Sequence, residues 1–260
     1  MTMPEELNEH GLVFHFTKAK AVIESILFYG NIRFAPLNRM NDPHEYKLVS
    51  RGVQSLGNID EIVASQALST LRKAILFDSK MLCFVEHKKN SCDAFDLPFT
   101  KPRSWAQYGE EQHGVCLAFR KNKLLANIRS NIDNVSIFEG PVAYDLDTKS
   151  QSKKNFIKEY DNKLTVEENV KRHIEAQKKD IYFRKYRDFK DENEYRIVLL
   201  DREQKSPEYI ICPIKGALHS VILGDRFHKG YIELVKELVA KLGANTFILT
   251  YGSVPYINKC

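Results

Sequence analysis

One stretch of the chain, residues 14–46, restricts the possible fold more than any other. It follows a short apolar strand at 13–16 with a helix, then Gly30, a second strand at 32–35 and a turn-rich loop. Apolar residues recur at helical spacing up to Gly30. Glycine commonly ends a helix because it adopts a positive φ without strain. The sequence therefore predicts a strand–helix–strand unit that leads into a loop.

The rest of the chain alternates short strands with helices in an irregular order, which is typical of an α+β fold with a mixed sheet. Further strands are expected at 81–85, 114–119, 135–144, 194–200, 208–213, 220–223 and 246–251. Further helices are expected at 59–77, 121–132 and 231–242. No repeat or linker interrupts the pattern, so residues 1–260 are expected to form a single domain.

Composition narrows the class of protein. No apolar run approaches the roughly 20 residues that span a bilayer, and the polar N-terminus is not a secretory signal, so we expect no membrane and a cytoplasmic location. The five cysteines show no C-x-x-C spacing, so we expect neither a disulfide framework nor a metal site. A net charge of +5 permits an anionic or nucleic-acid partner without requiring one. The oligomeric state stays open.

Two longer segments lack the pattern of a short strand. Residues 87–103 contain two prolines and no periodicity, and their length favours a mobile lid beside a site. Residues 149–190 are rich in lysine and carry periodic apolar residues, which predicts a helix pair. That segment is either a solvated helix face or a surface that meets phosphate groups.

His15 is the first candidate site residue. In a strand His15 and Thr17 share one face, while Phe14 and Phe16 share the other and point into the core. His15 would then face a site, the alternative being a buried, hydrogen-bonded histidine. Asn41 and Asp42, before Pro43, form either a structural turn or a rigid polar loop facing the same cavity.

Two more groups stand later in the chain. Trp105 and Tyr108 lie on one face of a helical turn, where they would stack on a planar ligand or pack in the core. In a strand, Glu192, Glu194 and Arg196 would project from one face. Two carboxylates and a guanidinium there would hold ribose hydroxyls and stabilise a developing cation, or form an ion-paired strand edge.

Taken in order, these motifs resemble an uncharacterised microbial family with a domain of unknown function. The resemblance rests on the following runs: His15-Phe16-Thr17, Gly30-Asn31-Ile32-Arg33, Asn41-Asp42-Pro43, Trp105-Ala106-Gln107-Tyr108, His113-Gly114-Val115-Cys116, Glu192-Asn193-Glu194-Tyr195-Arg196 and Ile222-Leu223-Gly224. It covers nearly the whole chain.

The opening unit and the late glutamates also resemble ADP-ribosyltransferases, especially those that modify nucleic acid. That resemblance implies a split mixed sheet, NAD as a substrate, His15 as a ribose binder and Glu194 as the catalytic carboxylate, with Glu192 in reserve. Tyr108 or Trp105 would stack on the nicotinamide or adenine ring.

The expected function is therefore an NAD-dependent ADP-ribosyltransferase-like enzyme whose acceptor is unknown. The lysine-rich segment slightly favours nucleic acid as the acceptor, and the resemblance implies a role in defence or as a toxin. Thr17, Asn41, Asp42 and Arg196 complete the expected NAD-binding set. The alternative is a catalytically inert module that binds a nucleotide or nucleic acid with the same pocket.

Overall fold

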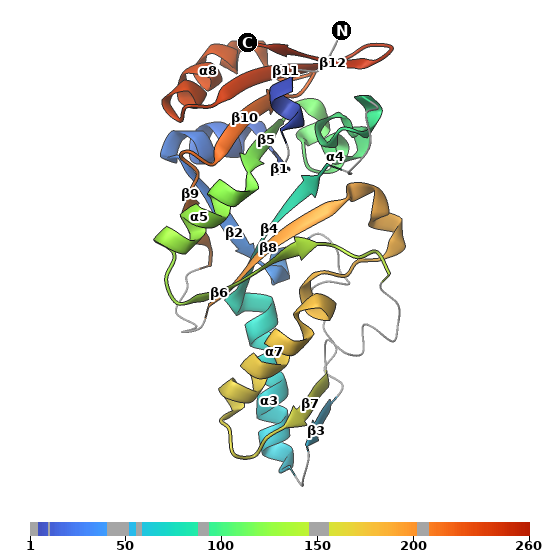
Figure 1. Cartoon of the computed structure of the whole chain (residues 1–260), viewed down its shortest axis with the longest axis vertical. Helices are drawn as coiled ribbons and strands as arrows, with labels where there is room; N and C mark the ends of the chain where they lie inside the picture. The colour runs from blue at the N-terminus through green and yellow to red at the C-terminus, as the bar shows by residue number, and fades with distance from the viewer. Residues whose placement is uncertain are drawn as a thin grey trace.

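The computed structural model is a mixed α+β fold in which helices surround one large mixed sheet (Figure 1). The structure describes residues 5–9, 11–40, 52–55, 59–87, 94–145, 156–201 and 208–260. Asn41 and Asp42, which the sequence places in a polar loop near the site, lie outside these residues. The large sheet is mixed, as the sequence predicts.

Ten strands of the described residues form the large sheet in the order β12-β11-β10-β5-β1-β4-β2-β9, with β8 on β4 and β6 on β8. The strands are β1 (Leu12–Thr17), β2 (Asn31–Pro36), β4 (Ser79–Glu86), β5 (Val115–Arg120), β6 (Val135–Pro141), β8 (Glu194–Asp201), β9 (Ile210–Pro213), β10 (Leu218–Leu223), β11 (Asn245–Tyr251) and β12 (Pro255–Lys259). Within it β10 and β11 are parallel, and the other pairs are antiparallel.

The opening unit forms as predicted. After β1 the chain is helical through α1 (Ala19–Ala21) and η2 (Val22–Leu27), which has π geometry, and it turns into β2 at Gly30, where φ is +65°. The Glu110 carboxylate, from η7 (Glu110–Gln112), accepts a hydrogen bond from the Ala19 N–H at 3.1 Å. A distant acidic side chain therefore satisfies a free N–H at the start of this helix.

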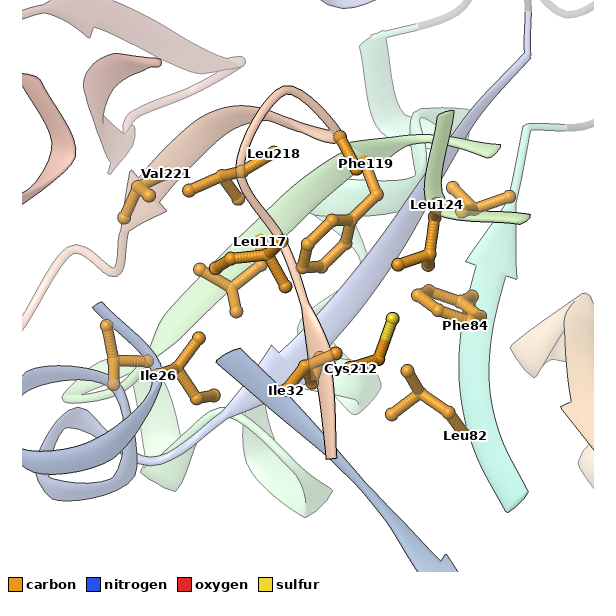
Figure 2. Packing of buried hydrophobic residues seen from close by; sticks show 14 of the residues in the cluster. Ile26, Ile32, Leu82, Phe84, Leu117, Phe119, Leu124, Cys212, Leu218 and Val221 are labelled. Atoms are coloured by element: carbon orange, nitrogen blue, oxygen red, sulfur yellow. The ribbon is translucent and has the colours of Figure 1, made fainter. Parts of the chain in front are cut away.

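One face of the sheet carries the largest core cluster. Figure 2 shows side chains of this cluster, among them Leu82 and Phe84 of β4 and Leu117 and Phe119 of β5. The helices η2, α5 (Lys121–Asn131) and α8 (Ile232–Lys241) contribute apolar side chains to this cluster. Because alternate strand residues point to opposite faces, Phe14 and Phe16 of β1 lie in a different cluster, together with Trp105.

A smaller unit extends from the sheet at the bottom of Figure 1. In it α3 (Glu61–Lys73) packs against α7 (Val166–Tyr182), beside a parallel pair formed by β3 (Gly52–Ser55) and β7 (Phe156–Tyr160). The described part of 149–190 is thus a strand, a helix and the 3-10 turn η8 (Arg187–Glu192) rather than a helix pair. Along α7 four basic residues alternate with four acidic ones, so the helix carries no basic stripe.

The segment 87–103 is the one expected to be a mobile lid, and its mobility stays a prediction. Residues 94–103 form the 3-10 turns η5 (Ala94–Asp96) and η6 (Pro98–Thr100) and then enter α4 (Pro102–Gln107). Leu97 and Phe99 are buried in a core cluster, and the Thr100 hydroxyl donates to the Ala94 carbonyl at 2.7 Å. This part of the segment is anchored by its apolar side chains, which sequence periodicity did not reveal.

The remaining elements complete the molecule: η1 (Glu5–Asn8), η3 (Leu37–Arg39), η4 (Ala74–Asp78) and η9 (Lys229–Tyr231). β12 was not predicted, because its residues read as a polar terminus. Among the described helices, none has the length and apolar character needed to cross a bilayer.

Candidate functional site

The site lies where the sheet splits along one edge of β4. β8 pairs with the other edge of β4 at seven positions. On the split edge, β1 pairs only through Phe14↔Val85 and its neighbour, and β2 only through Ala35↔Met81 and its neighbour. Residues 82–84 therefore have no strand partner on that edge within the described chain, and the sheet opens there.

A cavity of about 290 Å³ occupies this split. Its volume is near the lower end of the range for small-molecule pockets, roughly 300–1,000 Å³. Side chains from β1, β2, β4, α4 and the end of η8 contribute to it. It is lined by Phe14, His15, Phe16, Arg33, Ala35, Arg39, Met40, Met81, Leu82, Cys83, Phe84, Val85, Ser104, Tyr108, Lys185, Glu192 and Glu194.

His15 is partly buried at the mouth of the split. Its Nδ1 lies 2.8 Å from the Cys83 carbonyl oxygen, and its ring is edge-on to Phe84. Burial lowers the pKa of His15 and outweighs the opposing effect of the Cys83 hydrogen bond, so the ring is neutral at pH 7. A carbonyl only accepts, so Nδ1 carries the hydrogen and Nε2 is left as an acceptor.

His15 and Glu194 line one cavity but leave the sheet on opposite faces. The register pairs Phe14 with Val85 and Val85 with Glu194, which puts these three side chains on one face. His15, next to Phe14, belongs to the other face. It reaches the cavity because β1 separates from β4 at this point, so the two side chains enter the same cavity from opposite faces of the sheet.

Three buried charges, Lys185, Glu192 and Glu194, form the polar wall of the cavity, and a fourth, Arg196, supports Glu194 from behind. The Lys185 ammonium lies 2.7 Å from Glu192 Oε2 and 3.3 Å from Glu194 Oε2. Arg196 donates to both oxygens of Glu194, from Nε at 2.8 Å and from a terminal nitrogen at 2.9 Å. All four side chains are at least nine-tenths buried, so each charge depends on its partners for stabilisation.

Opposing influences act on the Glu194 carboxyl group. Burial alone would raise its pKa, but the Arg196 guanidinium, the Lys185 ammonium and a hydrogen bond from the Cys83 thiol outweigh burial and lower the pKa to about 2. Glu194 is therefore ionised at neutral pH, with most of its charge compensated by two cations.

Glu192 is held differently. It ends η8 rather than starting β8, because Asn193 adopts a left-handed conformation with φ of 45°. The Tyr108 hydroxyl donates to Glu192 Oε1 at 2.9 Å. Burial and then the charge of Glu192 raise the pKa of Tyr108, so the phenol stays protonated. Glu192 thus meets one cation and one neutral donor.

Other predicted site residues lie elsewhere. Trp105 is fully buried, donates from its indole nitrogen to the Phe99 carbonyl at 2.8 Å and packs edge-on against Phe16, so it belongs to the core. Thr17 continues the β1–β5 ladder and does not line the cavity. Arg196 lies behind Glu194, where it also donates to the Tyr182 carbonyl.

Sequence reasoning missed several lining residues. Lys185 had no local signal, because its partners come from the next turn and the next strand. Arg33 did have one, since it alternates with the buried Ile32 and Phe34 on β2 and so points away from that core. Across the described chain, no group of three or more His, Cys, Asp or Glu residues could hold a metal ion.

In the comparison with known proteins, one family model matches part of the chain. Residues 104–197 match the family model described as "Protein of unknown function (DUF2971)". The match spans the segment from α4 to β8 that supplies Tyr108, Lys185, Glu192 and Glu194 to the cavity. No curated protein and no solved structure matches the chain significantly.

Proposed function

From a site whose family has no assigned activity, we propose that the protein is an NAD-dependent ADP-ribosyltransferase-like enzyme. One observation carries the proposal. A strand-borne histidine, a tyrosine and a pair of late glutamates, which come from three distant parts of the sequence, line a single cavity at the split of a mixed sheet. This is the arrangement that the resemblance to ADP-ribosyltransferases implies for NAD.

The size of the cavity defines what it encloses. About 290 Å³ accommodates one nucleoside half of a dinucleotide, so the other half extends toward the open side. The neutral His15 offers Nε2 as an acceptor for a ribose hydroxyl. Tyr108 provides an aromatic ring in the cavity and a phenol that orients Glu192.

Departure of nicotinamide leaves positive charge on the ribose, and a preorganised carboxylate stabilises that charge. We assign this role to Glu192 before Glu194. Arg196 and Lys185 together offset the charge of Glu194, whereas Glu192 is met by Lys185 and the uncharged Tyr108. Because its negative charge is less compensated, the Glu192 carboxylate stabilises a developing cation more strongly.

The acceptor stays open. The charges on α7 balance, so that helix gives no support to nucleic acid, and the net charge of +5 gives only mild support. Defence or toxicity is a proposal from the resemblance, and arrest of growth on expression that Glu192→Gln abolishes would support it.

The test is release of nicotinamide from NAD by the purified protein, with and without added nucleic acid or protein acceptors. Glu192→Gln keeps the shape of the side chain and removes its charge, so turnover should fall by roughly 10²–10³-fold with little change in NAD affinity. Glu175→Gln, an exposed carboxylate on α7, is the matched control and should behave as wild type. Full turnover in Glu192→Gln would contradict the assignment.

One observation favours a second candidate, an inert nucleotide-binding module. Both glutamates already have cationic partners, as in a purely structural charge network. Binding of NAD without release of nicotinamide under every acceptor condition would favour the inert module, and absence of NAD binding would reject both candidates.

A further inference from the structure

Two arginines on the β2 side of the cavity are not used by the proposed chemistry. Arg33 on β2 and Arg39 at the end of η3 both line the cavity and are both exposed. Their guanidinium carbons lie 5.2 Å and 4.9 Å from the centre of the Tyr209 ring. Tyr209 immediately precedes β9, and β9 pairs with β2, so one aromatic ring holds both guanidiniums beside the split.

The charges of this group do not balance. Arg39 forms an ion pair with Glu208, and this is the acidic partner that the described residues provide for the two arginines. The group of Arg33, Arg39 and Glu208 therefore carries a net charge of +1. Two like charges held beside one ring repel each other, and an anion between them would relieve that repulsion.

The chemistry of the group selects the anion. A guanidinium presents parallel N–H donors that match two oxygens of a phosphate, and stacking on an aromatic ring reduces the entropy lost on binding. β2 and β8 pair with opposite edges of β4, so the arginines and Glu194 lie on opposite sides of the split. A phosphate at the arginines would thus leave room for a nucleoside reaching the glutamates.

We infer that Arg33 and Arg39, held by Tyr209, form a subsite for the diphosphate group of a nucleotide ligand. The inference rests on the proposed function only for the identity of the nucleoside. It assigns the open end of the cavity to phosphate recognition and adds Glu208 as an internal competitor, because its carboxylate occupies Arg39 until the ligand arrives.

Calorimetric titration with inorganic diphosphate, ADP and adenosine tests the subsite. Arg33→Gln and Arg39→Gln should each weaken diphosphate and ADP binding by roughly 10-fold, the loss expected for a hydrogen-bonded charge. Adenosine affinity should change by less than about twofold. Arg129→Gln, an exposed arginine on α5, is the matched control and should leave all three affinities unchanged.

Glu208→Gln should act in the opposite direction and tighten diphosphate binding, because it releases Arg39. A variant that merely disturbs the fold cannot produce that gain. Unchanged diphosphate affinity in both arginine variants, or no diphosphate binding by the wild type, would overturn the subsite. If the arginine variants lose diphosphate binding and the wild type never cleaves NAD, the subsite is supported and the proposed function is not. If the wild type cleaves NAD and Arg33→Gln leaves KM for NAD unchanged, the proposed function is supported and the subsite is not.

Discussion

Glu194 illustrates how one buried residue links pH to stability. Its pKa is about 2 in the folded protein, below the usual value of 4.5, because two cations outweigh the effect of burial. Between these pH values the Glu194 carboxyl is protonated in the unfolded chain and ionised in the folded protein. The stability from this group is therefore complete above about pH 4.5 and is lost as pH falls toward 2.

Glu194→Gln should lower the free energy of unfolding at pH 7 by about 3–5 kcal/mol, the cost of breaking a buried ion pair. An exposed pair would cost about 1 kcal/mol or less, but this one is 7 % exposed at Glu194 and 2 % at Arg196. Denaturant unfolding from pH 2 to 7 measures both effects. The variant should also lose part of the acid dependence, and a wild-type profile in Glu194→Gln would contradict this account.

His15 should make nucleotide binding sensitive to acid. Its pKa is lowered by burial to below 6.5, so the ring gains a proton only below that value. The second proton removes the acceptor at Nε2 and places a charge in a partly buried position. NAD affinity measured from pH 7.5 to 5 should therefore fall toward the acid end. His15→Gln should bind weakly at every pH, and an acid dependence that persists in it would assign the effect to another group.

The predictability of the site differed from residue to residue. His15, Tyr108, Glu192 and Glu194 were all predicted from the sequence and share the cavity. The same aromatic motif predicted Trp105 and Tyr108 as ligand-stacking residues. The Trp105 indole nitrogen instead donates a hydrogen bond to a backbone carbonyl within the core. Whether an aromatic ring faces a ligand or the core depends on packing between distant segments, which local spacing does not contain.

At the scale of elements, the turn after α4 depends on glycine. A Cβ at Gly114 would lie 2.4 Å from the Thr17 carbonyl oxygen and 2.7 Å from that of Gly109. Both neighbours are backbone atoms that hold β1 and the turn in place. Gly114→Ala should lower the free energy of unfolding by about 1–3 kcal/mol or more, because backbone has to move.

Gly140→Ala on β6 is the control for that substitution. Its nearest contact would be the Phe183 ring at 3.8 Å, an ordinary van der Waals distance, so thermal or denaturant unfolding should change little. Equal destabilisation in the two variants would show that loss of any glycine, and not the backbone contact at 114, is responsible.

Regular elements were easier to predict than irregular ones. The strands β1, β4 and β8 lie within two residues of the predicted ranges, since a buried strand shows in composition alone. The predicted strand 194–200 starts where β8 starts. The site motif was nevertheless expected to extend that strand back to Glu192, because the left-handed conformation of Asn193 has no signal in periodicity. The split edge of β4 is set by pairing between segments and could be expected only through the family resemblance.

At the scale of the whole molecule, β8 joins the two larger cores. Its residues Ile197 and Leu199 lie in the core under the α5 and α8 helices, whereas Val198 and Leu200 lie in the core with α3 and α7. The α3–α7 unit cannot unfold without exposing one face of this strand. We therefore expect a single cooperative unfolding transition.

Ile174→Ala tests that expectation. Ile174 is fully buried in the α7 core, and its truncation should cost about 2–5 kcal/mol. Trp105, the single tryptophan, lies in the cluster near β1 and reports on it by fluorescence, while circular dichroism reports on the helices. Both signals should shift to the same lower midpoint. Separate midpoints would show that the α3–α7 unit unfolds independently.

The contact between His15 and the Cys83 carbonyl has a consequence for mutational tolerance. The partner of the imidazole is a main-chain oxygen, which every amino acid supplies, so replacing Cys83 by another residue that β4 accepts leaves this bond available. The tautomer of His15 is therefore set by the position of a backbone carbonyl and not by a neighbouring side chain. A substitution at position 83 would remove the thiol hydrogen bond to Glu194, but it would not alter which nitrogen of His15 is left to accept.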